Sequence, residues 1–207
     1  MPRLLAIGLL LMGGAAGAAD IVPSDPANVV PLAVGSAIPT VVVQNPDGSD
    51  RRIGPGPLDR PTILIFYRGG WCPYCNRHLG VLKKVEPQLL GLGYDLLFLS
   101  ADRHQILYSS LKEPDVHYTL LSDASMSAAR AYHVAYQLDA TALAKYGEYG
   151  VDLEAASGYR HHQLPVPAVF IVDKLGVVRF VYANPDYTTR ISPDALLEAA
   201  QRVVGSH

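Results

Sequence analysis

The sequence FYRGGWCPYC, residues 66–75, contains both cysteines of the 207-residue chain. Residues 62–67 form a continuous apolar, β-branched and aromatic run, which is typical of a strand buried on both faces. The Gly-Gly pair that follows permits a sharp change of direction, and Pro73 suits the first turn of a helix because its ring pre-sets φ. The stretch therefore predicts a strand that turns into a helix whose N-cap is Cys72.

An N-cap position changes the chemistry of a cysteine. The sulfur of Cys72 would face the free N–H groups of Tyr74 and Cys75, at the positive end of the helix dipole. Both effects favour the thiolate, which is the reactive species. Cys75 lies three residues later on the same helix face, close enough to form a disulfide with Cys72.

Two structural roles compete with a reactive one. A purely structural bridge between residues 72 and 75 would stabilise the fold little, because the loop that it closes is short. Structural zinc requires four ligands, and the chain has no second cysteine pair, which excludes a zinc ribbon or finger. We therefore expect no metal site and no cofactor.

Composition indicates a compact globular protein without a nucleic-acid partner. The chain has 17 basic and 19 acidic residues, so it lacks the basic surface that nucleic acids require. Its low charged fraction and its many apolar residues indicate a sizeable core.

The first 19 residues have the three-part pattern of a signal peptide. Arg3 provides the positive charge, an apolar stretch too short to span a bilayer follows, and small residues precede a cleavage site near Ala18 or Ala19. We expect residues 1–19 to be removed and residues 20–207 to form one domain that is periplasmic or secreted, with no membrane span. Structural disulfides are normal in such an oxidising compartment, so a lone cysteine pair suggests retention for reactivity.

The remaining patterns predict a mixed sheet covered by helices. After the 62–67 strand, apolar spacing predicts a helix from Pro73 that Pro87 kinks, and a parallel strand follows at 95–100. The other expected elements are a hairpin at 40–44 and 51–53, a helix at 103–112, a strand at 117–121, a helix at 125–133, strands at 168–172 and 177–182, and a final helix capped by Ser192. Residues 134–163, rich in tyrosine and interrupted by glycine, read as an insertion or functional loop.

These residues resemble the thioredoxin superfamily over most of the mature chain. The segment WCPYC at 71–75 combines the Trp-Cys of thioredoxins with the Cys-Pro-Tyr-Cys of glutaredoxins, and VPAVFIVD at 166–173 resembles their cis-proline segment. Together with FYR at 66–68 and FLSAD at 98–102, the pattern is similar to the AhpC/TSA redoxins, especially peroxiredoxin-like proteins with a CxxC motif. The resemblance implies a thioredoxin-like fold with an N-terminal hairpin and an insertion before the cis-proline strand.

The resemblance also implies roles for individual residues. Pro167 would be cis and close to the sulfurs, the Val166 backbone would pair with a bound chain, and Trp71 would pack beside the site. The expected catalytic residues are Cys72, Cys75, Pro167, Trp71 and His162, and the expected substrate-binding residues are Val166, Pro73, Tyr74 and Arg68.

The chain departs from both families that it resembles. In the peroxiredoxin motif Pro-x-x-x-Thr/Ser-x-x-Cys, Arg68 replaces the proline, Cys72 replaces the hydroxyl residue, and Cys75 occupies the peroxidatic position. The peroxide-polarising arginine aligns with Pro167, and the buried acid of thioredoxins aligns with Phe66. These departures leave the chain without a recognised proton acceptor.

Two pairs of residues are candidates for adjusting the chemistry. His161 and His162 could take the proton from Cys75, because histidine titrates in the right range; the alternative is that they are ordinary surface histidines. Arg68 and Arg77 could lower the Cys72 pKa or simply be solvated. We expect Tyr146, Tyr149 and Tyr159 to be packing and lid residues.

The hypothesis is thiol-disulfide exchange in which Cys72 attacks a substrate disulfide and Cys75 resolves the mixed disulfide, leaving a Cys72–Cys75 disulfide. Expected partners are disulfide-containing proteins or small thiols, with a membrane thiol reductase as a candidate electron donor. One alternative is a thiol peroxidase that passes through a sulfenic acid. Another is a copper-handling protein with His161 or His162 as a further ligand.

Overall fold

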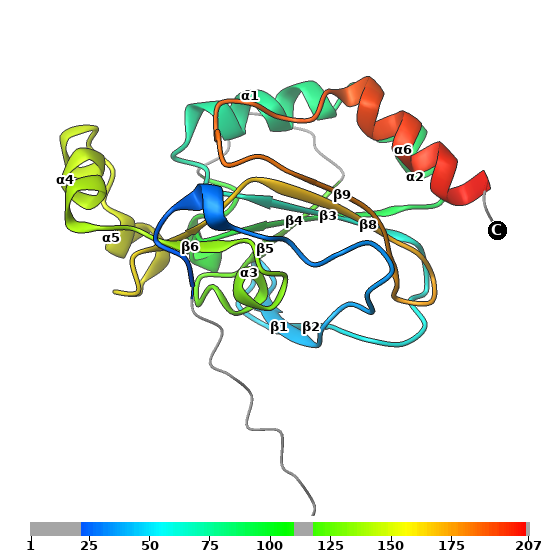
Figure 1. The fold of residues 1–207 in the computed structure, drawn as a ribbon, viewed down its shortest axis with the longest axis horizontal. Helices are drawn as coiled ribbons and strands as arrows, with labels where there is room; N and C mark the ends of the chain where they lie inside the picture. Colours follow the sequence, from blue (N-terminus) through cyan, green and yellow to red (C-terminus); the bar gives the residue numbers. More distant parts are fainter. Residues whose placement is uncertain (1–21, 110–117, 206–207) are drawn as a thin grey trace, which may run out of the picture.

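The computed structural model describes residues 22–109 and 118–205, and its centre is a seven-stranded mixed sheet (Figure 1). The strand order is β2-β1-β5-β4-β3-β8-β9. The bounds are β1 (Val41–Gln44), β2 (Asp50–Ile53), β3 (Thr62–Tyr67), β4 (Asp95–Ser100), β5 (Thr119–Ser122), β8 (Ala168–Val172) and β9 (Val178–Ala183). β3 pairs in parallel with β4 and antiparallel with β8, so the cysteine-bearing turn leaves the central strand. This is the mixed thioredoxin-like architecture that the sequence predicts.

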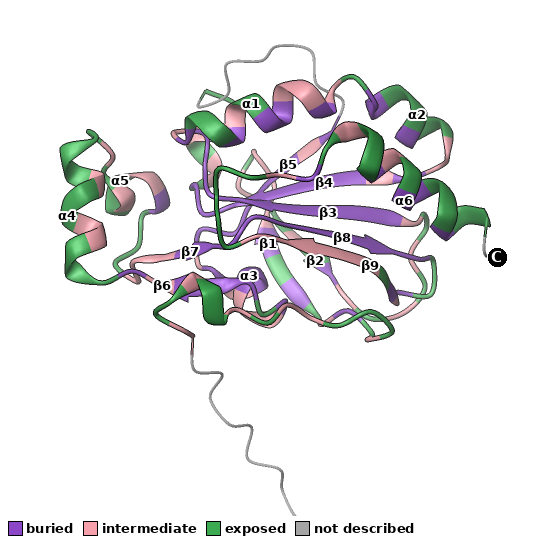
Figure 2. Ribbon diagram, turned by 45° about the horizontal axis from the view of Figure 1, so that its top comes forward, coloured by how far each residue is buried: buried purple, intermediate pink, exposed green. Residues whose placement is uncertain are grey.

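Helices cover both faces of the sheet, and β3 supplies apolar side chains to each. α1 (Pro73–Leu82), α2 (Glu86–Gly91) and α6 (Pro193–Gly205) lie on one face, where Ile63 and Ile65 join their core. α3 (Ser127–Ala131) packs on the other face, where Leu64 and Phe66 join its core. Because alternate residues of a strand point to opposite faces, both halves of the core meet on β3. Figure 2 shows β3, β4 and β8 buried at the centre.

The predicted long helix after Cys72 is two helices. α1 ends at Leu82 and α2 begins at Glu86, with Pro87 in its first turn. A proline inside a helix removes a hydrogen bond and clashes with the preceding turn, whereas it is tolerated at a helix start. The chain therefore breaks before Pro87 instead of bending through it.

The predicted insertion forms a small unit at one end of the sheet (Figure 1). β6 (Ala135–Gln137) pairs with β7 (Gln163–Pro165), and α4 (Ala140–Glu148) and α5 (Leu153–Ser157) lie between them. The side chains of Asp139 and Asp152 accept from backbone N–H groups of Ala142 and Ala155 and so cap these two helices. Two short 3₁₀ helices, η1 (Pro26–Asn28) and η2 (His104–Ile106), complete the described elements.

Two sequence predictions fall wholly or partly outside the described residues. The signal peptide at 1–19 lies outside them. The helix expected at 103–112 lies outside them only in its last three residues, and its described part, 103–109, contains only the short 3₁₀ helix η2 instead of an α-helix. Among residues 22–109 and 118–205, no helix has the length and apolar character needed to cross a bilayer.

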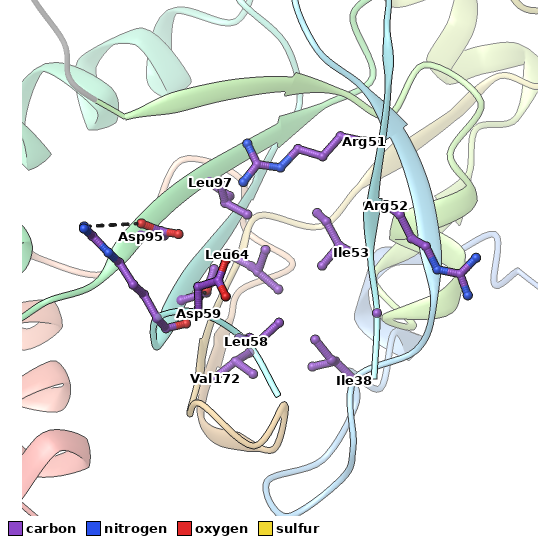
Figure 3. A pocket seen from close by; sticks show the side chains of 13 residues that line it. Ile38, Arg51, Arg52, Ile53, Leu58, Asp59, Leu64, Asp95, Leu97 and Val172 are labelled. Carbon is purple, nitrogen blue, oxygen red and sulfur yellow. Dashed lines mark hydrogen bonds and ion pairs between the residues drawn. The ribbon is translucent and has the colours of Figure 1, made fainter. Parts of the chain in front are cut away.

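A small pocket lies at the end of the sheet opposite the cysteine turn. Its volume is about 190 Å³, and Ile53 and Leu64 point into it from β2 and β3 (Figure 3). Among the residues that line it, Arg60 forms an ion pair with Asp95 at 3.9 Å. No cysteine is among the residues that line it.

Candidate active site

Cys72 occupies the N-cap of α1, as the sequence predicts, with Pro73 at the first helical position. The turn before it requires glycine, because Gly69 has a φ of +153° and a Cβ there would lie 2.3 Å from Nε1 of Trp71. The Cys72 side chain makes no capping hydrogen bond of ordinary geometry. The local sequence therefore sets the position of the sulfur, and other groups stabilise its charge.

The two sulfurs have opposite chemical characters. The neighbouring Cys75 side chain lowers the pKa of Cys72 to about 6, against the effect of burial. Arg68, the Cys75 backbone and Arg190 lower the Cys72 pKa further. Burial raises the pKa of Cys75 well above its usual value, and the neighbouring Cys72 side chain and its charge add to this rise. Cys72 is thus the sulfur that ionises more readily, and Cys75 is the one that stays a thiol. Both are free thiols in this structure, so a disulfide between them stays a prediction.

Arg68 stands beside the Cys72 sulfur and is itself buried. Its Nη1 lies 3.9 Å from Sγ of Cys72, and its side chain is only 2% exposed. The guanidinium lies 3.9 Å from the ring centroid of Tyr187, near the rings of Trp71 and Tyr146, and donates to the Tyr146 hydroxyl. Arg77 instead lies over the Tyr74 ring on the exposed side of α1. The structure thus distinguishes the two arginines, of which either could have lowered the Cys72 pKa as far as the sequence showed.

Sequence reasoning missed a second arginine at the sulfurs. Nη2 of Arg190, from the segment between β9 and α6, lies 3.6 Å from Sγ of Cys75. The side chain also donates to the carbonyls of Tyr187 and Thr189, which fixes its direction. No local pattern marks Arg190, because the contact depends on how the last loop crosses α1.

Asp102 is the buried carboxyl group nearest the turn, and the sequence did not assign it to the site. Its Oδ2 accepts from the backbone N–H of Gly70 at 2.7 Å, and the residue is fully buried. Burial raises the pKa of Asp102 to about 6, against the hydrogen bonds that it accepts from Gly70 and Ser100. The charge of Cys72 raises this pKa further. Asp102 therefore ties the glycine turn to the end of β4.

A pocket of about 470 Å³ opens over Cys72. One wall is the insertion helix α4, which contributes Tyr146 and Lys145, and Tyr74 and Tyr187 line it from α1 and the last loop. Cys72 is only 1% exposed, so a reactant reaches its sulfur through this pocket. The insertion thus shapes access to the site, and Tyr146 and Tyr149 line the pocket, as the lid role expected for them predicts.

Comparison with protein families matches residues 34–181, well over half of the chain, to the AhpC/TSA family model. The chain belongs to the AhpC/TSA family. A search of curated proteins found no match.

Solved structures share the fold of this AhpC/TSA chain. A peroxiredoxin-like protein from Aquifex aeolicus has 23% identity and a TM-score of 0.64, with 84% of this chain and 90% of that chain covered. Peroxidoxin BcpB from Mycobacterium tuberculosis has 17% identity and a TM-score of 0.59, with coverages of 84% and 96%. AhpC from the same organism has 15% identity and a TM-score of 0.60, with coverages of 86% and 96%.

The AhpC/TSA chain differs from the sequence prediction at Pro167. The described residues contain no cis peptide bond, so the expectation of a cis Val166–Pro167 bond is wrong. Both residues are already engaged in the extended path from β7 to β8: the N–H of Val166 donates to the carbonyl of Val134 at 2.8 Å, and the carbonyl of Pro167 accepts from Asn184 at 3.2 Å. Val166 is also only 1% exposed and its N–H is already bonded, so the pairing of its backbone with a bound chain stays a prediction.

The two histidines proposed as bases for the AhpC/TSA site are engaged elsewhere. Nε2 of His161 lies 2.7 Å from the carbonyl of Ala124, and Nε2 of His162 lies 2.8 Å from Oε1 of Glu154. No hydrogen bond joins either of them to a sulfur in the described part of the chain. Tyr159 stacks on His161, as a packing role predicts.

A histidine that the sequence did not single out lies closer to the chemistry of this AhpC/TSA site. His78, one turn after Cys75, is buried, and its Nε2 lies 3.1 Å from the carbonyl of Ile191. Burial lowers its pKa to about 4, and Arg190 lowers it further. The neutral imidazole donates to Ile191 and so anchors the loop that carries Arg190.

Metal ligands do not gather at the AhpC/TSA site. Within residues 22–109 and 118–205 there is no group of three or more histidine, cysteine, aspartate or glutamate side chains able to hold an ion. His161 and His162 bond to other groups, so the copper-handling alternative gains no further ligand from the described residues.

Proposed function

We propose that this chain is a thiol oxidoreductase that exchanges the Cys72/Cys75 dithiol with a substrate disulfide. The observation that carries the proposal is the placement of Cys72 at the start of α1 with Nη1 of Arg68 3.9 Å from its sulfur, while Nη2 of Arg190 lies 3.6 Å from the sulfur of Cys75. The neighbouring Cys75 side chain and these guanidinium groups lower the Cys72 pKa to about 6. Such a pair supplies a nucleophile at neutral pH and keeps the second thiol protonated until it is needed.

The reaction has two steps. The Cys72 thiolate attacks one sulfur of the substrate, forms a mixed disulfide and releases the other sulfur as a thiolate. Cys75 then loses its proton, attacks Cys72 and releases the second substrate thiolate. The substrate gains two electrons and its thiolates are protonated according to pH, while the protein keeps a Cys72–Cys75 disulfide.

The depth of Cys72 favours a small substrate. The sulfur is 1% exposed and is reached through a pocket of about 470 Å³, which suits a low-molecular-weight disulfide better than a folded protein. Tyr74 and Tyr187 meet edge to face at the mouth, with ring centroids 5.7 Å apart. A protein disulfide would need this pair to separate.

A thiol peroxidase is the second candidate, favoured by Arg68 beside the thiolate and by the family match. In that reaction Cys72 would take one oxygen from a hydroperoxide to give a sulfenic acid and an alcohol. Cys75 would then displace water from the sulfenic acid and leave the same disulfide.

The two candidates separate by their rates of oxidation. The fully reduced protein is mixed with glutathione disulfide, hydrogen peroxide or cumene hydroperoxide, and the fluorescence of Trp71, the single tryptophan, reports formation of the disulfide. We expect the second-order rate constant for the disulfide to exceed both peroxide values by at least about tenfold. The reverse order would assign the chain to the peroxidases.

The nucleophile is assigned with two matched variants. Cys75→Ser should accumulate a mixed disulfide on Cys72, detected by intact mass, because the resolving thiol is missing. Cys72→Ser should accumulate little, because Cys75 is a buried thiol with a raised pKa. Trapping only on Cys72→Ser would reverse the assignment.

Export and the electron donor complete the proposal. The pattern of residues 1–19 supports cleavage near Ala18 or Ala19, after which the enzyme would act in the periplasm or outside the cell with small thiols or a membrane thiol reductase as donor. N-terminal sequencing of the protein recovered from the exported fraction tests the cleavage.

A further inference from the structure

Arg68 is a buried cation without a carboxylate partner. Its side chain is 2% exposed, and among the described residues no Asp or Glu oxygen forms an ion pair with it. Its Nε has no hydrogen-bond partner in that part of the chain. Burying a charge is costly unless an opposite charge or hydrogen bonds compensate it. The Tyr146 hydroxyl and the surrounding aromatic rings compensate part of this cost, but none of them carries a net negative charge, so a nearby anion would stabilise the guanidinium further.

In the reduced protein the anion is the Cys72 thiolate. Nη1 of Arg68 lies 3.9 Å from its sulfur, and the charge of Arg68 favours the thiolate form. Asp102, the other acid that acts on Cys72, binds the backbone of Gly70 and forms no ion pair with Arg68. The charge of Arg68 is thus balanced by one sulfur.

Oxidation removes that balance. When the Cys72 thiolate and the Cys75 thiol become a disulfide, two electrons pass to the substrate, one proton is released, and neither sulfur keeps a charge. Arg68 then remains buried beside a neutral disulfide. The aromatic ring of Tyr187, 3.9 Å from the guanidinium, offers a partial substitute but carries no net charge.

The pocket over Cys72 can admit a replacement anion. Arg68 lines this pocket, and Lys145 supplies a second positive charge from α4. Its other walls include the aromatic side chains of Tyr146, Tyr149 and Tyr187. Two cations and several aromatic faces suit a small carboxylate that carries an apolar or aryl arm.

We propose that this pocket is a redox-dependent carboxylate site, filled in the oxidised protein and disfavoured in the reduced one, and that the thiol that reduces the Cys72–Cys75 disulfide is a small carboxylate-bearing thiol. The second half rests on the proposed function. The first half does not, because it concerns binding to a protein whose Cys72 has lost its charge.

The binding test compares two charge states of the same pocket. Oxidised and reduced protein are titrated with 3-phenylpropionate and with its neutral analogue 3-phenylpropionamide, using Trp71 fluorescence and calorimetry. We expect the carboxylate to bind the oxidised form at least about tenfold more tightly than the reduced form, and the amide to show no such preference. Equal carboxylate affinity for both forms, or equal affinity of acid and amide, would overturn the proposal.

Three variants test the same proposal: one does so without oxidising the protein, and the other two show whether the carboxylate binds in the pocket over Cys72. Reduced Cys72→Ser lacks the thiolate and should bind 3-phenylpropionate as the oxidised wild type does. Lys145→Met should weaken binding to the oxidised protein severalfold, whereas Lys84→Met, on the exposed side of the chain between α1 and α2, should leave it unchanged. A Cys72→Ser protein that binds no more tightly than the reduced wild type contradicts the charge argument whether or not the chain exchanges disulfides.

The kinetic test addresses the reductant. Oxidised protein is reduced by 3-mercaptopropionate or by 2-mercaptoethanol. Each rate constant is expressed per thiolate and is then divided by the rate constant with which the same thiol reduces a small uncharged reference disulfide. We expect the carboxylate thiol to be favoured by about tenfold, and the preference to shrink in Lys145→Met but not in Lys84→Met. Equal normalised rates reject the carboxylate thiol as reductant, while failure of both thiols to reduce the protein counts against the proposed function instead.

Discussion

Nη2 of Arg190 lies 3.6 Å from Sγ of Cys75, although 115 residues separate the two in the chain. Arg68 has the corresponding position at Cys72, with Nη1 3.9 Å from its sulfur. Each sulfur therefore has its own guanidinium. The Arg190 loop is held in place on one side by the hydrogen bonds that Asp186 accepts from Thr188 and Thr189, and on the other by His78.

Arg190→Met should slow the second chemical step. Burial raises the Cys75 pKa, and the positive charge of Arg190 opposes this rise. Removing that charge therefore makes the Cys75 thiolate, which resolves the mixed disulfide, harder to form. We expect the mixed disulfide on Cys72 to persist roughly tenfold longer after mixing with glutathione disulfide, while the first attack changes less. Quenched-flow mass spectrometry measures both steps. Arg202→Met, at an exposed site on α6, is the matched control and should behave as wild type.

The thiolate of Cys72 should titrate far below an ordinary cysteine. With a pKa of about 6, the rate of alkylation by iodoacetamide should rise with pH through a midpoint near 6. Arg68→Met should move this midpoint upward, because the guanidinium lowers the Cys72 pKa, whereas Arg77→Met should leave it in place. A midpoint near 9 in the wild type would contradict the assigned nucleophile.

The same pKa fixes how stability and reduction potential depend on pH. The folded pKa of Cys72 lies below its ordinary value of 9.0, so its contribution to the stability of the reduced protein is complete above pH 9 and is lost as pH falls toward 6.

Reduction of the disulfide takes up two protons below the Cys72 pKa and one proton above it. The potential should therefore fall by about 59 mV per pH unit below pH 6 and by about 30 mV above it. A single slope from pH 4 to 8 would be inconsistent with a low Cys72 pKa.

Asp102→Asn should act on the turn and on Cys72 together. The folded pKa of Asp102, about 6, lies above the model-compound value of 3.8, so its contribution to stability is present below pH 4 and is lost as pH rises through 6. Urea unfolding at several pH values should show the wild type losing up to about 3 kcal/mol relative to the variant across this window. The amide oxygen can still accept from Gly70, and the missing negative charge should move the Cys72 alkylation midpoint downward. A parallel pH profile for the two proteins would mean that Asp102 is charged without penalty.

The parts of the site that the sequence predicted are the local ones. The strand, the glycine turn and the helix start at Pro73 follow from neighbouring residues, and they place Cys72 at the N-cap as expected. Short-range backbone rules decide such features, since each residue acts on the turn beside it. Arg190 has no such local rule, because its distance from Cys75 depends on the register of β9 and the packing of α6.

The features that the sequence predicted wrongly or did not reveal depend on contacts between segments that are far apart in the chain. The cis bond expected at Pro167 was carried over from a resemblance, whereas the backbone of Val166 is bonded to Val134 across the short β6–β7 sheet. The pocket depends on α4, which the glycine-interrupted sequence did not reveal as a helix. The sequence did not decide whether Arg68 or Arg77 lowers the Cys72 pKa, because burial is a property of the assembled fold.

Gly69→Ala should disrupt the turn that joins Asp102 to Trp71. A Cβ at this position would lie 2.3 Å from Nε1 of Trp71 and 2.7 Å from Oδ1 of Asp102, and the φ of +153° is unfavourable for any residue with a side chain. We expect a loss of about 1–3 kcal/mol in unfolding free energy and a change in Trp71 emission, because the indole must move away from the carboxylate. Gly147→Ala is the control: its added Cβ meets nothing within 4 Å, and alanine is favoured inside α4, so stability should stay within about 1 kcal/mol or rise. If Gly69→Ala were as stable as wild type with unchanged emission, the indole and the carboxylate would not be held at this turn, and the route by which β4 fixes the Cys72 loop would have to be sought elsewhere.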